Sequence, residues 1–248
     1  MNVEHLSDAL RYRLFWWKHS QFFLRRGKFR VRQVKLGGRT VQLSVPAGEE
    51  QVMDYEFQSI FYGDCYGLGK IEGTVETILD VGSNLGFFSL TARSRFPSAR
   101  IHSYEPNPKV QNHLQHNTRD LNIEVRAEAV GGADGWIDMQ MNETSLLATA
   151  VNSEAGKIKK TAFANIVERI GGTVDLLKLD CEGAEWEIFE CKDVWEKVRR
   201  ITMEYHLWAN PNMDLPGLVK IVRDLGFRIT ALEEAAELKW GVLQAVKI

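Results

Sequence analysis

From about residue 76 to its end, the chain alternates short hydrophobic runs with amphipathic stretches. Clustered Val, Ile and Leu residues predict buried strands, and apolar residues recurring every three or four positions predict helices. On these criteria strands are expected over 76–82, 100–106, 122–130, 174–180 and 199–206, and helices over 85–96, 108–121, 163–171, 184–198 and 215–226. Strand–helix alternation of this kind is typical of a parallel sheet that helices cover on both faces.

The last two hydrophobic segments, residues 226–234 and 238–248, are separated by only a short connection. A connection this short joins antiparallel strands, because a parallel pair needs a long crossover. The pattern therefore predicts an antiparallel hairpin at one edge of the sheet. Two weaker strand signals, at 136–141 and 146–151, lie in the middle of the chain.

The first 70 residues have a different pattern. Leucines and a tryptophan at helical spacing before Gly27 predict one or two helices. Alternating apolar residues in 29–36 and 39–45, around two glycines, predict a β-hairpin, and 50–62 returns to helical spacing. We expect residues 1–70 to form a helical and hairpin extension, and 71–248 to form the main α/β domain.

The net charge of −2 conceals an uneven distribution. Residues 11–35 hold nine Lys or Arg and no acid, so 22 basic residues face 33 acidic ones in the remainder. The near balance argues against a protein whose whole surface grips nucleic acid. Aromatic residues interleave with the basic ones in 11–35. Packing of this arm on the domain or on a second copy of the chain is favoured, and the alternatives are binding to an anionic membrane surface, to nucleic acid or to a partner.

Cysteine usage and hydropathy indicate a cytoplasmic protein, peripheral at the membrane if the basic arm binds one. Cys65, Cys181 and Cys191 contain no C-x-x-C pair and leave an odd cysteine, which favours free thiols in a reducing compartment. No run approaches the roughly 18 apolar residues of a membrane span, and the first residues do not resemble a secretory signal.

A candidate cofactor loop follows the strand at 76–82. Its residues Asp80, Gly82, Asn84 and Gly86 span a glycine turn that opens a helix, where backbone N–H groups are free to bind a ligand. Glu105 ends the next strand, where a carboxylate can accept both hydroxyls of a ribose.

The spacing of this loop bears on which cofactor it takes. The middle glycine of G-x-G-x-x-G, which admits a pyrophosphate, is missing, so an NAD(P)-dependent oxidoreductase is the less favoured alternative. D-x-G-x-x-x-G is the loop of S-adenosylmethionine sites, and Asp80 is then expected near the cationic tail of that ligand.

Further candidate groups follow the next two strands. Asp180 and Glu182 end one strand, and Glu204 and His206 end another, so all should face the cofactor cleft. His206 is our first candidate for the group that accepts a proton, and Glu182 is the second. A less favoured alternative is a divalent cation bound by Asp180, Glu182 and Glu204. Lys178, inside an apolar strand, needs a carboxylate partner or a backbone acceptor, and an ion pair with an acid is favoured.

The segments ILDVGSNLGFFSL, SYEPNP, DLLKLDCEGAEWEIF and MEYH together resemble the FkbM family of S-adenosylmethionine-dependent methyltransferases. The resemblance covers residues 50–248, and LKLDCEGAE is its most specific part. It implies the class I methyltransferase fold, in which the last of seven strands is inserted antiparallel. The expected fold is thus α/β: a Rossmann-like, doubly wound, seven-stranded, mostly parallel sheet with one antiparallel edge strand and the N-terminal extension.

The resemblance also implies an activity, O-methylation of hydroxyls on sugars or polyketides, and a set of site residues. The cofactor positions it implies are Asp80, Gly82, Asn84, Gly86, Glu105, Asn107 and, beside the adenine, Glu128, Ala129 and Val130. Tyr55, Tyr62 and Tyr66, just before the first strand, are candidates to line the pocket of a small-molecule or glycan acceptor. D-C-E-G stands where base-methylating enzymes have an N-P-P-Y-like motif, which argues against nucleobases. A non-catalytic adaptor with the same fold is a further alternative.

Overall fold

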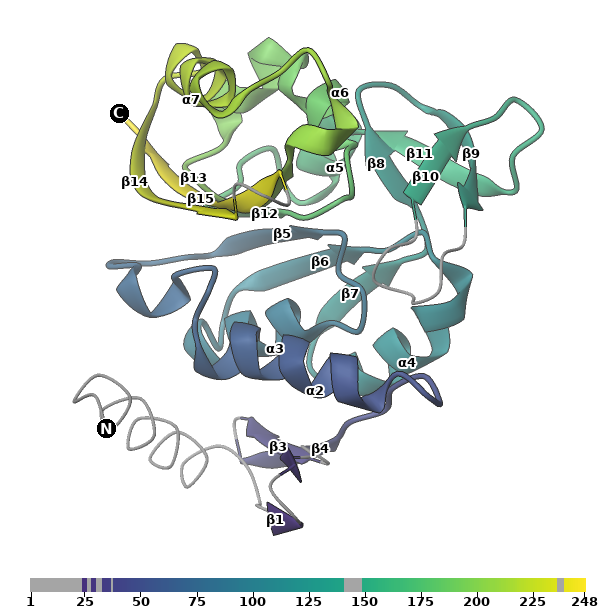
Figure 1. Cartoon of the computed structure of the whole chain (residues 1–248). Helices are drawn as coiled ribbons and strands as arrows, with labels where there is room; N and C mark the ends of the chain where they lie inside the picture. The colour runs from purple at the N-terminus through teal and green to yellow at the C-terminus, as the bar shows by residue number, and fades with distance from the viewer. Residues whose placement is uncertain (1–23, 26–27, 30–32, 37, 141–148, 236–238) are drawn as a thin grey trace.

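A seven-stranded sheet forms the centre of the molecule, in the order β14-β15-β13-β12-β5-β6-β7 (Figure 1). The computed structural model describes residues 24–25, 28–29, 33–36, 38–140, 149–235 and 239–248. The strands of the sheet are β5 (Thr77–Val81), β6 (Arg100–Tyr104), β7 (Ile123–Arg126), β12 (Leu176–Leu179), β13 (Arg200–His206), β14 (Phe227–Ala235) and β15 (Trp240–Lys247). All except β15 run parallel, as the alternating pattern predicts.

The predicted closing hairpin lies at the sheet edge, but its antiparallel member is the inner strand. β15 pairs antiparallel with both β13 and β14, so β14 forms the edge. Burial explains this order: Leu243 and Ala245 of β15 are buried, whereas Leu232 of β14 is 40% exposed. The antiparallel strand is thus inserted one position in from the edge, as the family resemblance implies.

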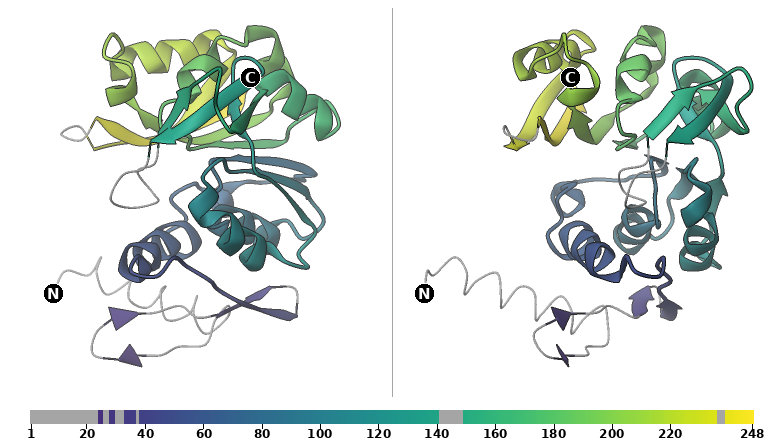
Figure 2. Two further views of the ribbon diagram at one scale, coloured as in Figure 1. Left: turned by 90° about the vertical axis from the view of Figure 1, so that its right-hand side faces the viewer. Right: turned by 45° about the vertical axis from the view of Figure 1, so that its right-hand side comes forward.

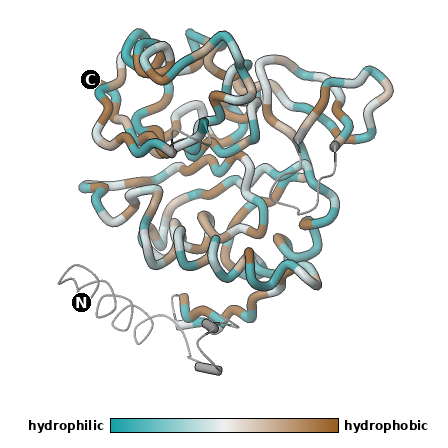
Figure 3. The backbone as a smooth tube through the Cα atoms, in the orientation of Figure 1, coloured by the Kyte–Doolittle hydropathy of each residue, from teal (hydrophilic) through white to brown (hydrophobic). Residues whose placement is uncertain are grey.

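Helices cover both faces of the sheet (Figures 1 and 2). One face carries α2 (Glu50–Phe57), α3 (Phe87–Arg95) and α4 (Pro108–Thr118), and the other carries α5 (Phe163–Arg169), α6 (Glu185–Phe189) and α7 (Leu215–Asp224). Successive residues of a strand pack against opposite helix layers: Leu177 belongs to the hydrophobic cluster with α5–α7, and Leu176 belongs to the cluster with α3. Hydrophobic residues accordingly concentrate along the central strands (Figure 3).

A second, four-stranded sheet in the order β10-β9-β11-β8 projects beyond one end of the main sheet (Figure 1). Its strands are β8 (Ala129–Gly131), β9 (Gly135–Gln140), β10 (Thr149–Asn152) and β11 (Ile158–Ala162). The sequence pattern predicts β9 and β10 weakly and merges β8 with β7. It misses β11 because that strand carries two lysines and little apolar periodicity.

Two of the predicted helices are each interrupted. The predicted helix over 184–198 divides into α6 and a 3₁₀ segment, Lys192–Lys197. The predicted helix over 50–62 divides into α2 and a π-helical turn, Gln58–Tyr62. The predicted hairpin is present as β3 (Gln33–Leu36) and β4 (Arg39–Gln42).

The described part of the N-terminal extension packs on the main domain. Val34 and Leu36 of the hairpin form one hydrophobic cluster with Met53 and Phe57 of α2 and Phe87 of α3. A short pair, β1 (Leu24–Arg25) and β2 (Lys28–Phe29), precedes it. The helices predicted before Gly27 and most of the basic arm at 11–35 lie outside the described residues. Among the helices that are described, none combines the length and apolar character needed to cross a membrane.

Candidate functional site

A cavity of about 670 Å³ opens at the carboxyl ends of the central strands. Its wall includes most of the residues that the sequence singles out, from the loop after β5, the end of β6, the segment before and within β8, and the ends of β12 and β13. These are Gly82, Asn84, Glu105, Asn107, Glu128, Ala129, Val130, Asp180, Glu182 and His206. The fold therefore brings the predicted cofactor and catalytic residues to one cavity.

The two glycines of the loop serve packing. A side chain on Gly82 (φ 77°) would place its Cβ 1.7 Å from the carbonyl oxygen of Asp180, so glycine lets the loop pass the end of β12. Gly86 (φ 82°) begins α3, and a Cβ there would lie 2.8 Å from Leu114 Cδ1 of α4. Gly86 does not line the cavity, so the expectation that it contacts the cofactor is corrected to a role in packing α3 on α4.

Asp80 also lies behind the cavity wall. Its side chain is fully buried, accepts a hydrogen bond from Ser89 Oγ at 2.7 Å and lies 3.5 Å from Lys178 Nζ. The prediction that Asp80 reaches the cofactor's cationic tail is therefore not supported, because its oxygens are directed to α3 and β12. Its position explains why a carboxylate is needed here: it neutralises a buried ammonium.

Glu105 has the geometry expected of a ribose-binding carboxylate. Its Oε2 accepts a hydrogen bond from the backbone N–H of Asn84 at 2.8 Å, and its Oε1 accepts one from that of Asn107 at 2.8 Å. Burial raises the pKa of Glu105 to about 7, against the lowering effect of these two bonds. Each oxygen keeps a second lone pair for a ligand hydroxyl. A vicinal diol fits this fixed, cavity-facing carboxylate.

The segment expected beside the adenine forms the far wall. Ala129 and Val130 are buried apolar residues that line the cavity. Glu128 accepts hydrogen bonds from Thr161 at 2.6 Å and from Arg169 at 3.0 Å, so its carboxylate is held by β11 and α5. Burial opposes the charge, but these bonds keep the pKa of Glu128 below its ordinary value. The segment thus offers an apolar surface anchored by a fixed charge.

The second sheet closes the cavity from the side. Ile137 and Met139 of β9 contribute to the wall. Asn152 of β10 donates to Glu187 Oε1 of α6 at 3.0 Å, and Lys160 of β11 lies 3.0 Å from Glu187 Oε2. These polar contacts tie the small sheet to the main domain across the opening.

Lys178 contacts two carboxylates and a backbone carbonyl at the base of the site. Its Nζ lies 3.3 Å from Asp180 Oδ2 and 3.5 Å from Asp80 Oδ1, and it donates to the carbonyl oxygen of Gly82 at 2.5 Å. Burial opposes the charge, but Asp180 and Asp80 raise the pKa of Lys178 above its ordinary value. The predicted ion pairing of Lys178 is confirmed.

Of the three tyrosines expected at the acceptor pocket, Tyr62 and Tyr66 are not in the cavity wall. Tyr66 is buried beneath Asp180, and its hydroxyl donates to Asp180 Oδ2 at 2.9 Å. Tyr62 lies in the π-helical turn and does not line the cavity. The expectation of direct acceptor contact is corrected for both, and Tyr66 instead orients Asp180. Tyr55, 71% exposed, does line the cavity.

His206 is surrounded by carboxylates. Glu185 Oε1 lies 2.9 Å from His206 Nδ1, while Nε2 lies 3.5 Å from Glu204 Oε1 and 3.6 Å from Glu182 Oε2. Burial opposes protonation, but the bonds to Glu185 and Glu204 and the charge of Glu182 raise the pKa of His206 to about 11. Carboxylates beside both ring nitrogens thus favour the imidazolium form of His206, which argues against the prediction that it accepts the proton.

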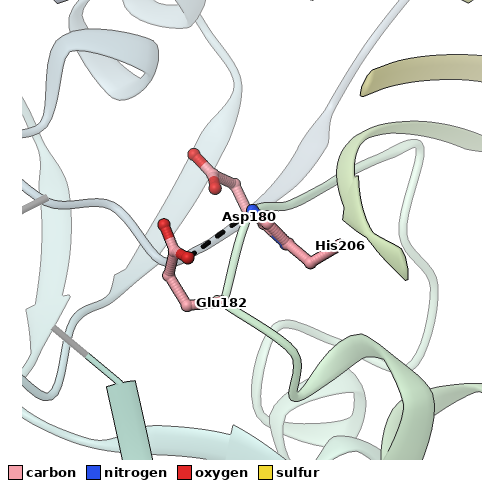
Figure 4. A group of neighbouring side chains, drawn as sticks. All are labelled: Asp180, Glu182 and His206. Carbon is pink, nitrogen blue, oxygen red and sulfur yellow. Dashed lines mark ion pairs between the residues drawn. The ribbon is translucent and has the colours of Figure 1, made fainter. Parts of the chain in front are cut away.

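Three groups at the site have metal-ligand spacing. Asp180, Glu182 and His206 each offer one ligand atom, and these atoms lie within 4.8 Å of one another. Figure 4 shows Glu182 reaching toward His206 from the segment after β12. The metal site considered from the sequence had Glu204 as its third ligand, whereas the structure places His206 beside Asp180 and Glu182. A cation bound here would have to displace the proton from Nε2.

Several cavity residues were not predicted from the sequence. They come from α2, the turn after β13 and the start of β15: Glu56, Trp208, Ala209 and Trp240. Burial, followed by the charges of Asp180 and Glu204, raises the pKa of Glu56 to about 7. Nothing distinguishes Glu56 in the sequence from the three other acids within and just before α2.

Comparisons with known proteins identify the family of the chain. Residues 80–229 match the model of the methyltransferase FkbM domain. Methyltransferase sdnD of Sordaria araneosa is 27% identical, over 70% of this chain and 82% of that protein. The 31-O-demethyl-FK506 methyltransferase FkbM of Streptomyces tacrolimicus is 24% identical, over 82% of this chain and 92% of that one.

Among solved structures, magnesium protoporphyrin IX methyltransferase (ChlM) from Synechocystis PCC 6803, with bound SAM, is 15% identical with a TM-score of 0.47, over 83% of this chain and 86% of that one. The family match spans the cofactor loop, Glu105 and the ends of β12 and β13. The chain belongs to the FkbM methyltransferase family.

Proposed function

We propose that the chain transfers a methyl group from S-adenosylmethionine to a hydroxyl oxygen of a saccharide or related natural product. The observation that carries this proposal is Glu105, a carboxylate oriented by two backbone amides into the cavity. Its fit to a ribose diol is supported by the apolar wall of Ala129 and Val130 beside it. A relative named as a methyltransferase of 31-O-demethyl-FK506 supports oxygen as the acceptor atom.

The cofactor would supply an electrophilic methyl group on a sulfonium. The acidic groups at the strand ends favour its positive charge, because Asp180, Glu182 and Glu204 face the same cavity as Glu105. Lys178 and Tyr66 fix the carboxylate of Asp180, and Glu185 fixes the imidazolium of His206. In this proposal these fixed groups would align the acceptor hydroxyl with the methyl–sulfur bond.

A divalent cation at Asp180, Glu182 and His206 is a second way to activate the acceptor, supported by the convergence of their ligand atoms. It would lower the pKa of a bound hydroxyl. Extensive dialysis against a chelator separates the two versions: loss of transfer that Mg²⁺ or Mn²⁺ restores favours the cation, and unchanged transfer favours protein groups alone.

The function is tested by incubating the purified chain with methyl-labelled S-adenosylmethionine and a fractionated cell extract. The expected result is a labelled product whose methyl group is an ether on a hydroxyl of a sugar or polyketide. A label on nitrogen or carbon contradicts O-methylation. Absence of label in every fraction, together with binding of NAD but not of S-adenosylhomocysteine, contradicts methyl transfer itself.

A further inference from the structure

The structure leaves open which group accepts the proton of the acceptor hydroxyl, because the histidine expected in that role has carboxylates beside both of its ring nitrogens. A proton acceptor must face the cavity, be free of a competing cation and ionise near the working pH. The candidates are the four cavity carboxylates at or near the ends of β12 and β13: Glu56, Asp180, Glu182 and Glu204.

Three of these four carboxylates are engaged. Asp180 lies 3.3 Å from Lys178 Nζ and accepts a hydrogen bond from Tyr66. Glu182 and Glu204 lie 3.6 and 3.5 Å from Nε2 of His206. Each of these three carboxylates therefore already has a charged or polar partner within 3.6 Å, and a proton passed to that oxygen would disturb the contact.

Glu56 differs from the other three. It lines the cavity, and the described residues provide it with neither a hydrogen bond nor an ion pair. Its helix is firmly placed, because the neighbouring Phe57 stacks on Phe61 at 4.9 Å and meets Phe87 edge-on at 5.2 Å. Glu56 is therefore a free carboxylate on a rigid element.

We propose that Glu56, supplied by the N-terminal extension, is the catalytic residue that accepts the acceptor's hydroxyl proton. This inference rests on the proposed function. As the acceptor oxygen bonds to the methyl carbon, the methyl–sulfur bond breaks with its electron pair remaining on sulfur, and the hydroxyl proton passes to the Glu56 carboxylate. Residue 56 lies before the family match at 80–229, so Glu56 would reach the site from the segment that precedes the matched domain.

The surroundings of Glu56 suit this task. Asp180, Glu204 and Cys65 are the acidic groups near it, and Lys178 is the nearby cation. Burial and the two carboxylates raise the pKa of Glu56 to about 7, so near neutral pH a substantial fraction is ionised. Turnover should then rise as pH increases through about 7 and level off above it.

The test compares the parent chain with Glu56→Gln, Glu56→Asp and the control Glu50→Gln, a residue of the same helix outside the cavity wall. The probe is methyl-labelled S-adenosylmethionine with the extract fraction that the parent chain labels. Glu56→Gln should lower the initial rate by about 10²–10⁴-fold, a typical contribution of a general base, and remove the pH inflection. Calorimetric binding of S-adenosylhomocysteine should be unchanged, which also shows that the variant is folded.

Glu56→Asp should lose less activity and keep an inflection, and Glu50→Gln should match the parent. Near-parental rates with the same pH profile in Glu56→Gln overturn the inference while leaving the proposed function intact. Equal losses in Glu56→Gln and Glu56→Asp with an unchanged inflection assign the titrating group elsewhere and also overturn it. If the parent chain labels no fraction, the proposed function fails, and this inference fails with it.

Discussion

Replacing Lys178 by methionine should destabilise the fold strongly, because this lysine neutralises two carboxylates in the core of the site. Its side chain is 3% exposed, that of Asp80 is 0% exposed, and the ammonium lies within 3.5 Å of both Asp80 and Asp180. Methionine has a side chain of similar length but leaves two carboxylates without a cation. Removing one partner of a buried pair costs about 3–5 kcal/mol.

This loss is large for a chain of this size, for which it corresponds to a fall of roughly 10 °C in Tm. The assay is urea unfolding followed by circular dichroism at pH 7.5. Lys197→Met is the matched control: its partner Glu168 is exposed, and such surface pairs contribute about 0–1 kcal/mol. Adding Asp80→Asn to Lys178→Met should recover part of the loss, because one orphaned charge disappears. A loss below about 1 kcal/mol for Lys178→Met would refute the claim that the site's charges are buried and interdependent.

Three further predictions concern other parts of the site. Gly82→Ala should destabilise the chain by more than about 1 kcal/mol in the same urea assay, since φ is 77° and the new Cβ would lie 1.7 Å from the Asp180 carbonyl oxygen; an unchanged midpoint contradicts this close approach. Glu185→Gln should lower the pKa of His206 from about 11, seen by NMR titration of the imidazole, and an unmoved titration shows that Glu185 does not hold the proton. Because burial raises the pKa of Glu182 to about 8, this residue stabilises the fold fully below about pH 4.5, and the stabilisation is lost as the pH rises through 8. Glu182→Gln should therefore reduce the decrease of the unfolding free energy between these two pH values, and an unchanged slope would contradict it.

Two features of the site could be predicted from the sequence, because the chemistry or the position of a single residue left few alternatives. An ammonium within an apolar strand must be paired, and Lys178 is paired. Glu105 follows a strand next to the cofactor loop, and strands that are parallel neighbours end at the same edge, so its place in the cavity followed from topology.

Other features depend on contacts between distant segments that no local pattern records. The protonation of His206 depends on Glu185, which returns from α6 to bind both its ring and its backbone N–H. The reason for a glycine at 86 lies in Leu114 of the next helix. Glu56 reaches the cavity because α2 packs on α3 through Phe57, and the spacing of its helix gives no sign of this.

The central claim, that this cavity binds the cofactor of a methyltransferase through Glu105, is tested most directly by calorimetric titration with S-adenosylhomocysteine. We predict saturable one-site binding that Glu105→Gln weakens about 10–100-fold, because charge-assisted hydrogen bonds to the ribose are lost. NAD titrated under the same conditions should give no binding, and circular dichroism should show that the variant remains folded. Binding of NAD without binding of S-adenosylhomocysteine, or equal affinity of the parent and Glu105→Gln for S-adenosylhomocysteine, would contradict the account.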